Sequence, residues 1–137
     1  MPSATDVVKQ LLDHLNAQRV DAAADLLAED LYYQEVPAKP LTGRETWRAY
    51  AVGFGMGSSL KVDWQLLAIA EDGEVVLNER IDNFTTSAGK KISIPLMGSF
   101  RIRNGLIAEW RDYFDLGDFE RQLAAIMPAV DTESANS

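Results

Sequence analysis

Asp112 is a carboxylate that the pattern of its own segment would bury. It lies between Trp110 and Phe114 in AEWRDYFD (108–115), whose aromatic residues favour a β-strand. Because side chains alternate along a strand, Asp112 shares one face with these two aromatic residues. An unpaired charge buried with them would cost several kcal/mol, so Asp112 needs a polar partner.

Arg80 and Asp82 are candidates for that partner. In VVLNERIDNF (75–84) they are two residues apart, so they share one face of a predicted strand. Both faces of this strand mix polar and apolar residues, and polarity alone does not decide which face is inside. If Arg80 and Asp82 point inward, they lie beside the predicted strand 91–103, with Asp112 one strand further on.

An arginine between two aspartates suits acid–base chemistry in a buried site. Its planar guanidinium can bind both carboxylates at once. The cation lowers the pKa of a carboxylate, whereas burial and a second carboxylate raise it, and pKa values driven apart in this way give one acid and one base. The alternative is a structural ion pair, on the surface or buried, and the spacing alone leaves both interpretations open.

Tyr33 and Glu35 add two polar groups on one face of a short predicted strand, 31–36. Tyr33 also fits ordinary amphipathic packing with its hydroxyl at a rim. Glu35, taken alone, is best interpreted as a solvated strand end.

Apolar periodicity and turn residues predict the elements that must position these groups. Helices are expected over 5–18 and 21–28, from about Arg44 and from about Asp118. Strands are expected over 31–36, 60–70, 74–86, 91–103 and 106–115. Helices followed by a long meander predict an α+β fold, in which three to four helices cover one face of a curved antiparallel or mixed sheet and leave a deep apolar pocket.

The last predicted hairpin leaves two registers open. A two-residue turn at 104–105 would place Met97 beside Asp112. A three-residue loop at 103–105 would place Leu96 opposite Asp112 instead, with Met97 on the other face. The three-residue loop is preferred because it gathers the apolar residues of both strands on one side.

Length and composition exclude several classes of protein. One domain is expected over 1–127, followed by a polar tail, 128–137, that is expected to be disordered. The absence of cysteine excludes thiolate catalysis and Cys-based zinc sites, and the single His14 excludes a multi-histidine metal cluster. A net charge of −8 disfavours nucleic acid and membrane surfaces as partners. With no apolar run of membrane-spanning length and no signal-peptide pattern, the chain is expected to be cytoplasmic.

Three segments resemble one family. NERID (78–82) and GLIAEWRDYFDLGDFE (105–120) look like the limonene-1,2-epoxide hydrolase family, part of the larger nuclear-transport-factor-2-like or SnoaL-like superfamily. AEDLYYQEVPAKPLTGRE (28–45) is similar to that family's first-strand region, and the likeness extends over about 5–125. The resemblance implies the superfamily's cystatin-like α+β cone.

The resemblance also implies a reaction and roles for individual residues. Hydrolysis of an epoxide would proceed in one step, without a covalent enzyme ester and without a cofactor or metal. Asp112 would take a proton from water, and Asp82 would protonate the epoxide oxygen. Arg80 would bridge the two carboxylates, and Tyr33 would help to position the water.

Glu35 departs from the family pattern, which has an asparagine two residues after the tyrosine. A carboxylate only accepts hydrogen bonds, whereas an amide both donates and accepts them. Glu35 is therefore an alternative base, a protonated residue acting like the amide, or a sign of different chemistry. The rivals to an epoxide hydrolase are a SnoaL-like isomerase or cyclase with a carboxylate base, and a non-catalytic small-molecule-binding protein.

The expected partners are an apolar small-molecule substrate, water and a second copy of the chain. Aromatic and aliphatic residues are expected to line the substrate pocket: Leu12, Leu15, Phe54, Phe84, Ile94, Leu96, Trp110, Phe114 and Phe119. Trp47 is assigned to the core or the pocket wall. A homodimer is expected to form through the outer sheet face, to which Ile107 and Tyr113 would contribute.

Overall fold

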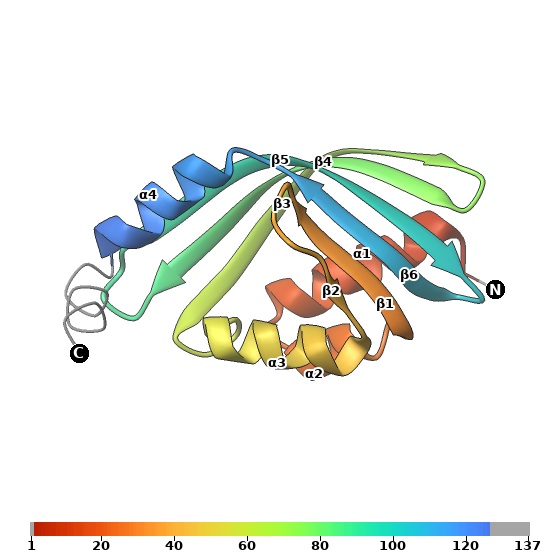
Figure 1. The fold of residues 1–137 in the computed structure, drawn as a ribbon, viewed down its shortest axis with the longest axis horizontal. Helices are drawn as coiled ribbons and strands as arrows, with labels where there is room; N and C mark the ends of the chain where they lie inside the picture. Colours follow the sequence, from red (N-terminus) through yellow and green to blue (C-terminus); the bar gives the residue numbers. More distant parts are fainter. Residues whose placement is uncertain (1, 127–137) are drawn as a thin grey trace.

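The structure, a computed structural model, describes residues 2–126, which form four helices and one six-stranded sheet (Figure 1). In chain order the elements are α1 (Ala4–Asn16), α2 (Val20–Ala24), β1 (Leu27–Val36), β2 (Leu41–Thr42), α3 (Arg44–Phe54), β3 (Leu60–Asp72), β4 (Val75–Thr86), β5 (Lys91–Arg103), β6 (Leu106–Tyr113) and α4 (Leu116–Ile126). The expected α+β class is confirmed. The tail predicted to be disordered, 128–137, lies outside the described residues.

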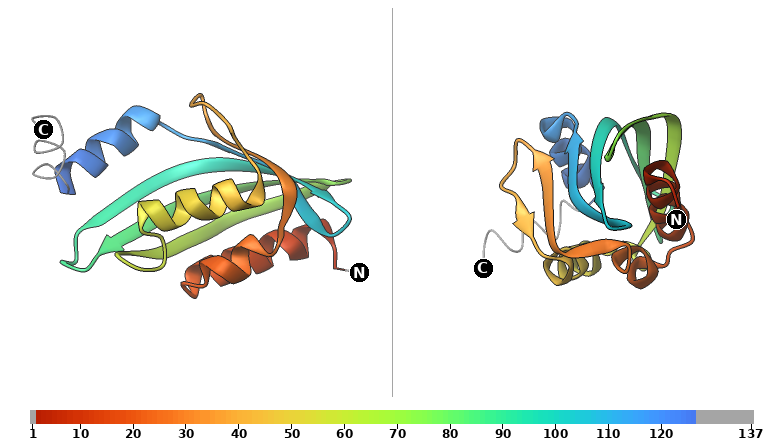
Figure 2. Two further views of the ribbon diagram at one scale, coloured as in Figure 1. Left: turned by 60° about the horizontal axis from the view of Figure 1, so that its bottom comes forward. Right: turned by 90° about the vertical axis from the view of Figure 1, so that its right-hand side faces the viewer.

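The strands form one curved, mixed sheet in the order β2-β1-β6-β5-β4-β3. β1 and β6 run parallel, and the other neighbouring pairs are antiparallel. The first three helices lie along the inner side of the sheet, whereas α4 lies at one end of it, against β5 (Figure 2).

Helix α1 is fixed at both ends by side-chain hydrogen bonds. At its N-terminus, Ser3 and Asp6 form a capping box. At its C-terminus, the Asn16 side chain binds the backbone N–H and C=O of Trp64, at 2.7 and 2.9 Å. Gln18 binds the backbone of Val62 in the same way, at 2.9 and 2.8 Å. Since β3 is an edge strand, these amides satisfy backbone groups that another strand would otherwise pair with.

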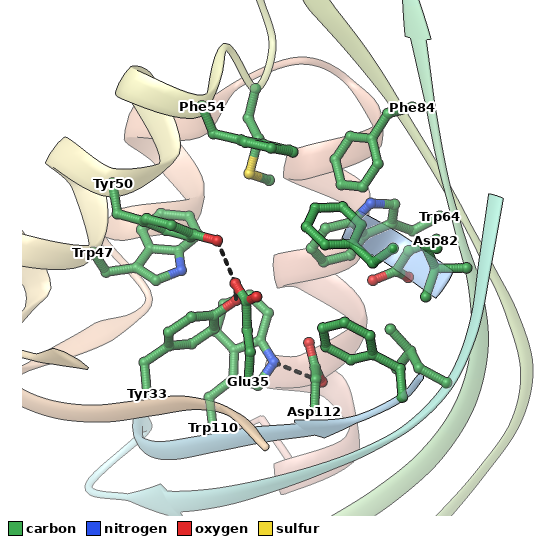
Figure 3. Close-up of a pocket in the computed structure, with 15 residues that line it drawn as sticks. Tyr33, Glu35, Trp47, Tyr50, Phe54, Trp64, Asp82, Phe84, Trp110 and Asp112 are labelled. Atoms are coloured by element: carbon green, nitrogen blue, oxygen red, sulfur yellow. Dashed lines mark hydrogen bonds between the residues drawn. The ribbon is translucent and has the colours of Figure 1, made fainter. Parts of the chain in front are cut away.

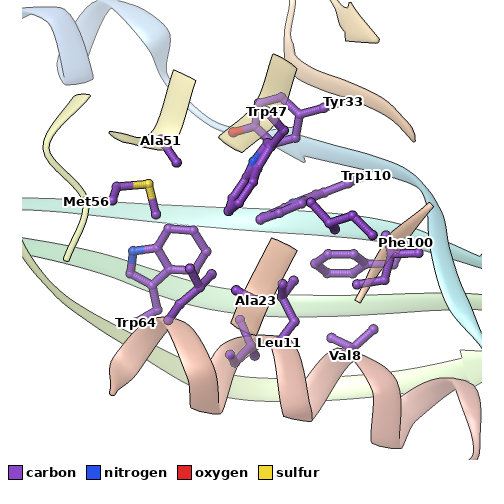
Figure 4. Close-up of a cluster of buried hydrophobic side chains, with 14 of the residues drawn as sticks. Val8, Leu11, Ala23, Tyr33, Trp47, Ala51, Met56, Trp64, Phe100 and Trp110 are labelled. Atoms are coloured by element: carbon purple, nitrogen blue, oxygen red, sulfur yellow. The ribbon is translucent and has the colours of Figure 1, made fainter. Parts of the chain in front are cut away.

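Aromatic rings around Trp110 form the centre of the core (Figure 4). The ring of Trp110 is fully buried and lies 5.0 Å from Tyr33, 5.7 Å from Trp47 and 5.2 Å from Phe100, between ring centroids. These three rings come from β1, α3 and β5. Packing in the core therefore fixes the strand that carries Asp112, two residues beyond Trp110.

The preferred register of the last hairpin is wrong in its turn and in the residue opposite Asp112. Asn104 and Gly105 form a two-residue turn with φ angles of +53° and +77°, the left-handed values that twisted hairpins favour. A β-bulge follows in β6, with Ala108 as the extra residue. The bulge shifts the pairing so that Gly98, rather than Leu96, lies opposite Asp112. The predicted inner and outer faces are retained, because Leu96 is buried and Met97 is half exposed.

The same bulge corrects the prediction that Ile107 lies on the outer sheet face. Ile107 and Ala108 are both buried, because the extra residue lets two successive side chains face inward. Tyr113 is on the outer face as expected, 49% exposed, with Met97 as its cross-strand partner.

The second predicted helix is shorter than expected. Helix α2 ends at Ala24, and the strand predicted over 31–36 already begins at Leu27. The backbone N–H of Ile107 donates to the C=O of Leu26, and Leu27 pairs with Ile107 in the ladder. Pairing with a distant strand thus overrides a local preference for helix.

None of the helices within residues 2–126 combines the length and the apolar character needed to span a membrane.

Candidate active site

Arg80 lies at the centre of a buried polar cluster on the inner face of the sheet. It is fully buried, and its neighbours Asp82 and Asp112 are 4% and 3% exposed. Both nitrogens on one edge of the guanidinium donate to Asp82, Nε to Oδ1 and Nη2 to Oδ2, each at 3.0 Å. The same Nη2 donates to Asp112 Oδ2, also at 3.0 Å. Arg80 and Asp82 therefore point inward, an orientation that the mixed polarity of their strand left open.

The remaining side of Arg80 is held by an amide and two aromatic rings. Nη1 donates to Asn78 Oδ1 at 2.9 Å. The guanidinium carbon lies 5.0 Å from the ring centroid of Trp64 and 5.9 Å from that of Phe100. These contacts fix the guanidinium plane, so both carboxylates are held in a defined orientation.

Asp112 is held in place by a hydrogen bond from Trp110 and by the pairing of its strand, β6, with β1. Trp110 Nε1 donates to Asp112 Oδ1 at 3.0 Å, which leaves Oδ2 to Arg80. In the parallel ladder between β1 and β6, Asp112 is paired with Glu35. The two carboxyl groups thus come from adjacent strands, and both line the same pocket.

Gly98 provides the space that the cluster needs. It pairs with Asn78 on β4 and with Asp112 on β6. A Cβ at this position would lie 2.8 Å from Arg80 Nη1 and 2.8 Å from Asp112 Oδ1. Only glycine therefore fits between the arginine and the aspartate at their observed separation.

The environment of the cluster drives its ionisation in a defined direction. Burial raises the pKa of Asp82, Arg80 lowers it, and the negative charges of Asp112 and Glu35 raise it again, giving a value of about 6. Burial also acts to lower the pKa of Arg80, but the charges of Asp112 and Asp82 outweigh it and raise that pKa above its ordinary value. Arg80 therefore remains a cation, while Asp82 can hold a proton near neutral pH.

Two tyrosine hydroxyls hold Glu35. Tyr33 donates to Glu35 Oε1 at 3.1 Å, and Tyr50, on α3, donates to the same oxygen (Figure 3). Burial and the charges of Glu35 and Asp112 raise the pKa of both tyrosines, so both hydroxyls stay protonated. Glu35 is half-buried, and its carboxylate lines the pocket rather than ending in solvent.

An apolar pocket opens onto these carboxyl groups. Figure 3 shows Asp82, Asp112 and Glu35 facing a common space that Phe54 and Phe84 also border. The complete lining comprises Tyr33, Glu35, Trp47, Tyr50, Phe54, Met56, Trp64, Asp82, Phe84, Ile94, Leu96, Trp110, Asp112, Phe114 and Phe119. The acidic groups therefore lie among mostly apolar and aromatic side chains.

Seven of the nine residues expected to line the pocket do so: Phe54, Phe84, Ile94, Leu96, Trp110, Phe114 and Phe119. Leu12 and Leu15 do not, because α1 packs them into the core, where they are buried. Helical spacing correctly predicts that they face inward, but it does not distinguish a core from a cavity.

Sequence reasoning missed Tyr50, Asn78 and the donor role of Trp110. Tyr50 is four residues before Phe54, which places it on the same side of a helix as a residue already assigned to the pocket. Asn78 is two residues before Arg80 and shares its face. Met56 and Trp64 also line the pocket, and neither was predicted to do so. The alternation of buried residues along β3 indicates that Trp64 faces inward, but it gives no information about Met56.

The acidic side chains of this pocket are of the kind that can transfer protons. Within residues 2–126, no group of three or more His, Cys, Asp or Glu side chains is placed to hold a metal ion. Three acidic groups can give and take protons at this pocket. They are one carboxyl group with a raised pKa, a second bound to the same cation and a third on the adjacent strand.

Comparison with known proteins identifies related chains. The family model of the limonene-1,2-epoxide hydrolase catalytic domain matches residues 2–125. The epoxide hydrolase EphG of Mycobacterium tuberculosis is 29% identical over 128 residues, which cover 90% of this chain and 84% of EphG.

Solved structures have the same fold. An M. tuberculosis LEH-like epoxide hydrolase superposes with a TM-score of 0.77 at 25% identity, covering 92% of this chain and 96% of its own. A putative SnoaL-like polyketide cyclase from Shewanella putrefaciens superposes with a TM-score of 0.76 at 16% identity, covering 91% and 98%. The similarity to the polyketide cyclase is evidence for a shared fold alone.

Gly98→Ala is expected to disrupt the cluster. The added methyl group would overlap Arg80 Nη1 and Asp112 Oδ1, so β5 must shift or the ion pair must open, at a cost of about 1–3 kcal/mol. Urea denaturation measures this loss of unfolding free energy. The matched control is Gly53→Ala on α3, where a Cβ meets nothing within 4 Å. Equal stability of Gly98→Ala and the wild type would contradict the observed register.

Asp82 is expected to reduce stability as the pH rises from about 4 to about 6. Its pKa is about 6 in the folded chain against an ordinary 3.8, so the folded state binds more protons than the unfolded state between these values. This contribution is complete below pH 3.8 and lost as the pH rises through about 6, by about 3 kcal/mol in total.

The measurement is the unfolding free energy of the wild type and of Asp82→Asn across this range. Asparagine does not titrate, so the advantage of the wild type over the variant should fall with rising pH and then level off. A difference that stays constant from pH 4 to pH 7 would show that Asp82 has no raised pKa.

Proposed function

Because the chain belongs to the limonene-1,2-epoxide hydrolase family, we propose that it hydrolyses an apolar epoxide to a vicinal diol by direct attack of water. The observation that carries this proposal is the contact of one guanidinium nitrogen with both Asp82 and Asp112, at 3.0 Å each, on the wall of an apolar pocket. Its relatives include proteins described as epoxide hydrolases.

The chemistry assigns a different task to each carboxyl group. Asp112, as a carboxylate, takes a proton from water while the water oxygen attacks an epoxide carbon. Asp82, with its raised pKa, gives a proton to the epoxide oxygen as the carbon–oxygen bond breaks, so that no free alkoxide leaves. The products are a diol and a cluster with one proton moved from Asp82 to Asp112, which exchange with solvent restores.

Arg80, Tyr33 and Glu35 prepare this step. Arg80 holds the two aspartates in one plane and keeps their combined charge low. Tyr33 and Glu35, on the strand next to Asp112 and joined by a hydrogen bond, would hold the water. The mostly apolar and aromatic lining lowers the local dielectric, which strengthens charge interactions at the reacting bond.

An apolar lining selects an apolar substrate. Phenylalanine, isoleucine and leucine side chains make up much of the pocket lining around the acidic groups, and they offer packing without hydrogen bonds. A terpene-like, steroid-like or lipid-derived epoxide fits this chemistry. Neither a cofactor nor a metal takes part in the proposed step.

One observation favours a second candidate function. Glu35 adds a third acidic group to the pocket, and a single carboxylate base is enough to abstract a proton bound to carbon. An isomerase or cyclase would need such a base but not the bridge from Arg80 to Asp82. Exchange of a substrate C–H with heavy water, without formation of a diol, would favour this second function.

The expected homodimer stays a prediction. It depends on the outer sheet face, where Leu77, Met97 and Tyr113 are each about half exposed. Sedimentation equilibrium measures the oligomeric state directly.

Asp112→Asn is expected to lower kcat/KM for diol formation by roughly 10²–10⁴-fold, because asparagine cannot accept the proton of water. The assay uses a panel of apolar epoxides, from limonene oxide to styrene and steroid oxides. The matched control is Asp63→Asn, since Asp63 is exposed on β3 and does not line the pocket. If the wild type forms no diol from any of these substrates, the proposed function is wrong; if Asp112→Asn retains full activity, Asp112 is not the base.

A further inference from the structure

We propose that Tyr50 is a positioning residue which, together with Tyr33, holds the Glu35 carboxylate as a second acceptor for the hydrogens of the attacking water. The proposal rests on the proposed hydrolase function and deepens it. It assigns a task to a residue on α3 that lies outside the strands of the cluster.

The contacts of Glu35 show how it is held. The Tyr33 and Tyr50 hydroxyls both donate to Oε1, and no side chain within residues 2–126 donates to Oε2. The ring of Tyr50 is fixed by Tyr33, at 6.1 Å between centroids, and by stacking on Phe54 at 6.4 Å. One carboxylate oxygen is therefore anchored, and the other stays free to accept.

The charges around Glu35 explain why it needs two donors. Asp112 is its partner in the parallel ladder, so two carboxyl groups lie on adjacent strands. Arg80 binds Asp112 and Asp82 but makes no ion pair with Glu35. The two tyrosine hydroxyls thus supply the stabilisation that a cation supplies to the aspartates.

This geometry suits a water held by two carboxylates. Such a water donates one hydrogen to Asp112 and the other to Glu35, which turns its lone pairs toward the substrate. Asparagine, the residue expected here from the family pattern, offers an amide oxygen for the same purpose without a charge. Glutamate keeps the acceptor and adds a charge, and the Tyr50 hydroxyl compensates for that charge.

A second cavity lies next to the residues proposed to hold this water. Tyr33, Glu35 and Tyr50 line both the main pocket and this second cavity, whose other lining residues are Ala38, Lys39 and Leu41. Since Lys39 is exposed, this cavity lies toward the surface on the far side of the three residues. Glu35 is thus at the boundary between the apolar pocket and a more polar space.

The test is a double-mutant cycle of Tyr50→Phe and Glu35→Asn, with kcat and KM measured separately on one epoxide. Phenylalanine keeps the ring packing and removes only the hydroxyl. In the wild-type background Tyr50→Phe should lower kcat by about tenfold or more, with KM within about twofold. In the Glu35→Asn background the same substitution should change kcat by less than about twofold, because the charge that needs the hydroxyl is gone.

A matched control isolates the hydroxyl from general effects on β1. Tyr32→Phe removes a hydroxyl that donates to Gln34 at 3.1 Å on the other face of the same strand, and it should leave kcat unchanged. Equal losses from Tyr50→Phe in both backgrounds, or no loss in the wild-type background, would overturn the proposal.

A second readout does not depend on turnover. The chemical shift of the Glu35 side-chain carboxyl carbon is measured by NMR at one fixed pH. Tyr50→Phe removes a hydrogen bond to this carboxyl group and should move the resonance, whereas Tyr32→Phe should leave it in place. An unmoved resonance in Tyr50→Phe overturns the proposal, whereas a moved resonance with no diol formed by the wild type rejects the hydrolase function alone.

Discussion

The buried charge of Arg80 is the constraint on which the rest of the site depends. A fully buried guanidinium is tolerated only when its donors are satisfied, and here Asp82, Asp112 and Asn78 accept from it while two rings cover its faces. Removing one partner of such a group typically costs about 3–5 kcal/mol, although a well-packed apolar substitute for the whole cluster often costs nothing. The cluster is thus a poor way to stabilise a fold, and its retention agrees with a chemical role.

The curved sheet places this buried cluster at the wall of a pocket. Three adjacent strands, β4, β5 and β6, provide Asp82, Gly98 and Asp112, and the missing side chain at Gly98 lets the arginine reach across β5. The parallel pairing of β1 with β6 then places Glu35 beside Asp112. Helices α3 and α4 contribute aromatic side chains to the rest of the lining, and the burial of Asp82 in this environment raises its pKa.

Much of the site follows from strand alternation, which is local and strictly periodic. It places Arg80 with Asp82, Asp112 with Trp110, and Tyr33 with Glu35, and the meander order predicts that the first two pairs meet. No periodic pattern in the sequence predicts the bulge at Ala108. The predictions of the residue opposite Asp112 and of an exposed Ile107 were therefore wrong. Register depends on the energy of the whole sheet rather than on any short segment.

Contacts between different helices and strands are harder to predict from the sequence than which side chains share a face of one helix or strand. Leu12 and Leu15 have the spacing of buried residues, yet the choice between core and pocket depends on how α1 lies on the sheet. Tyr50 reaches Glu35 only because α3 packs against β1, and no spacing in the sequence indicates that contact. The curvature of the sheet and the position of α4 likewise depend on packing between segments that are distant in the sequence.

The measurement that tests the proposed chemistry most directly is a single turnover in water labelled with heavy oxygen, with enzyme in excess over an apolar epoxide. Direct attack of water, activated by Asp112 and assisted by Asp82, predicts that the diol from the first turnover carries one heavy oxygen. A carboxylate that attacked the epoxide itself would form an ester, and hydrolysis of that ester would give a first diol with oxygen from the protein. An unlabelled first diol would therefore contradict the one-step mechanism.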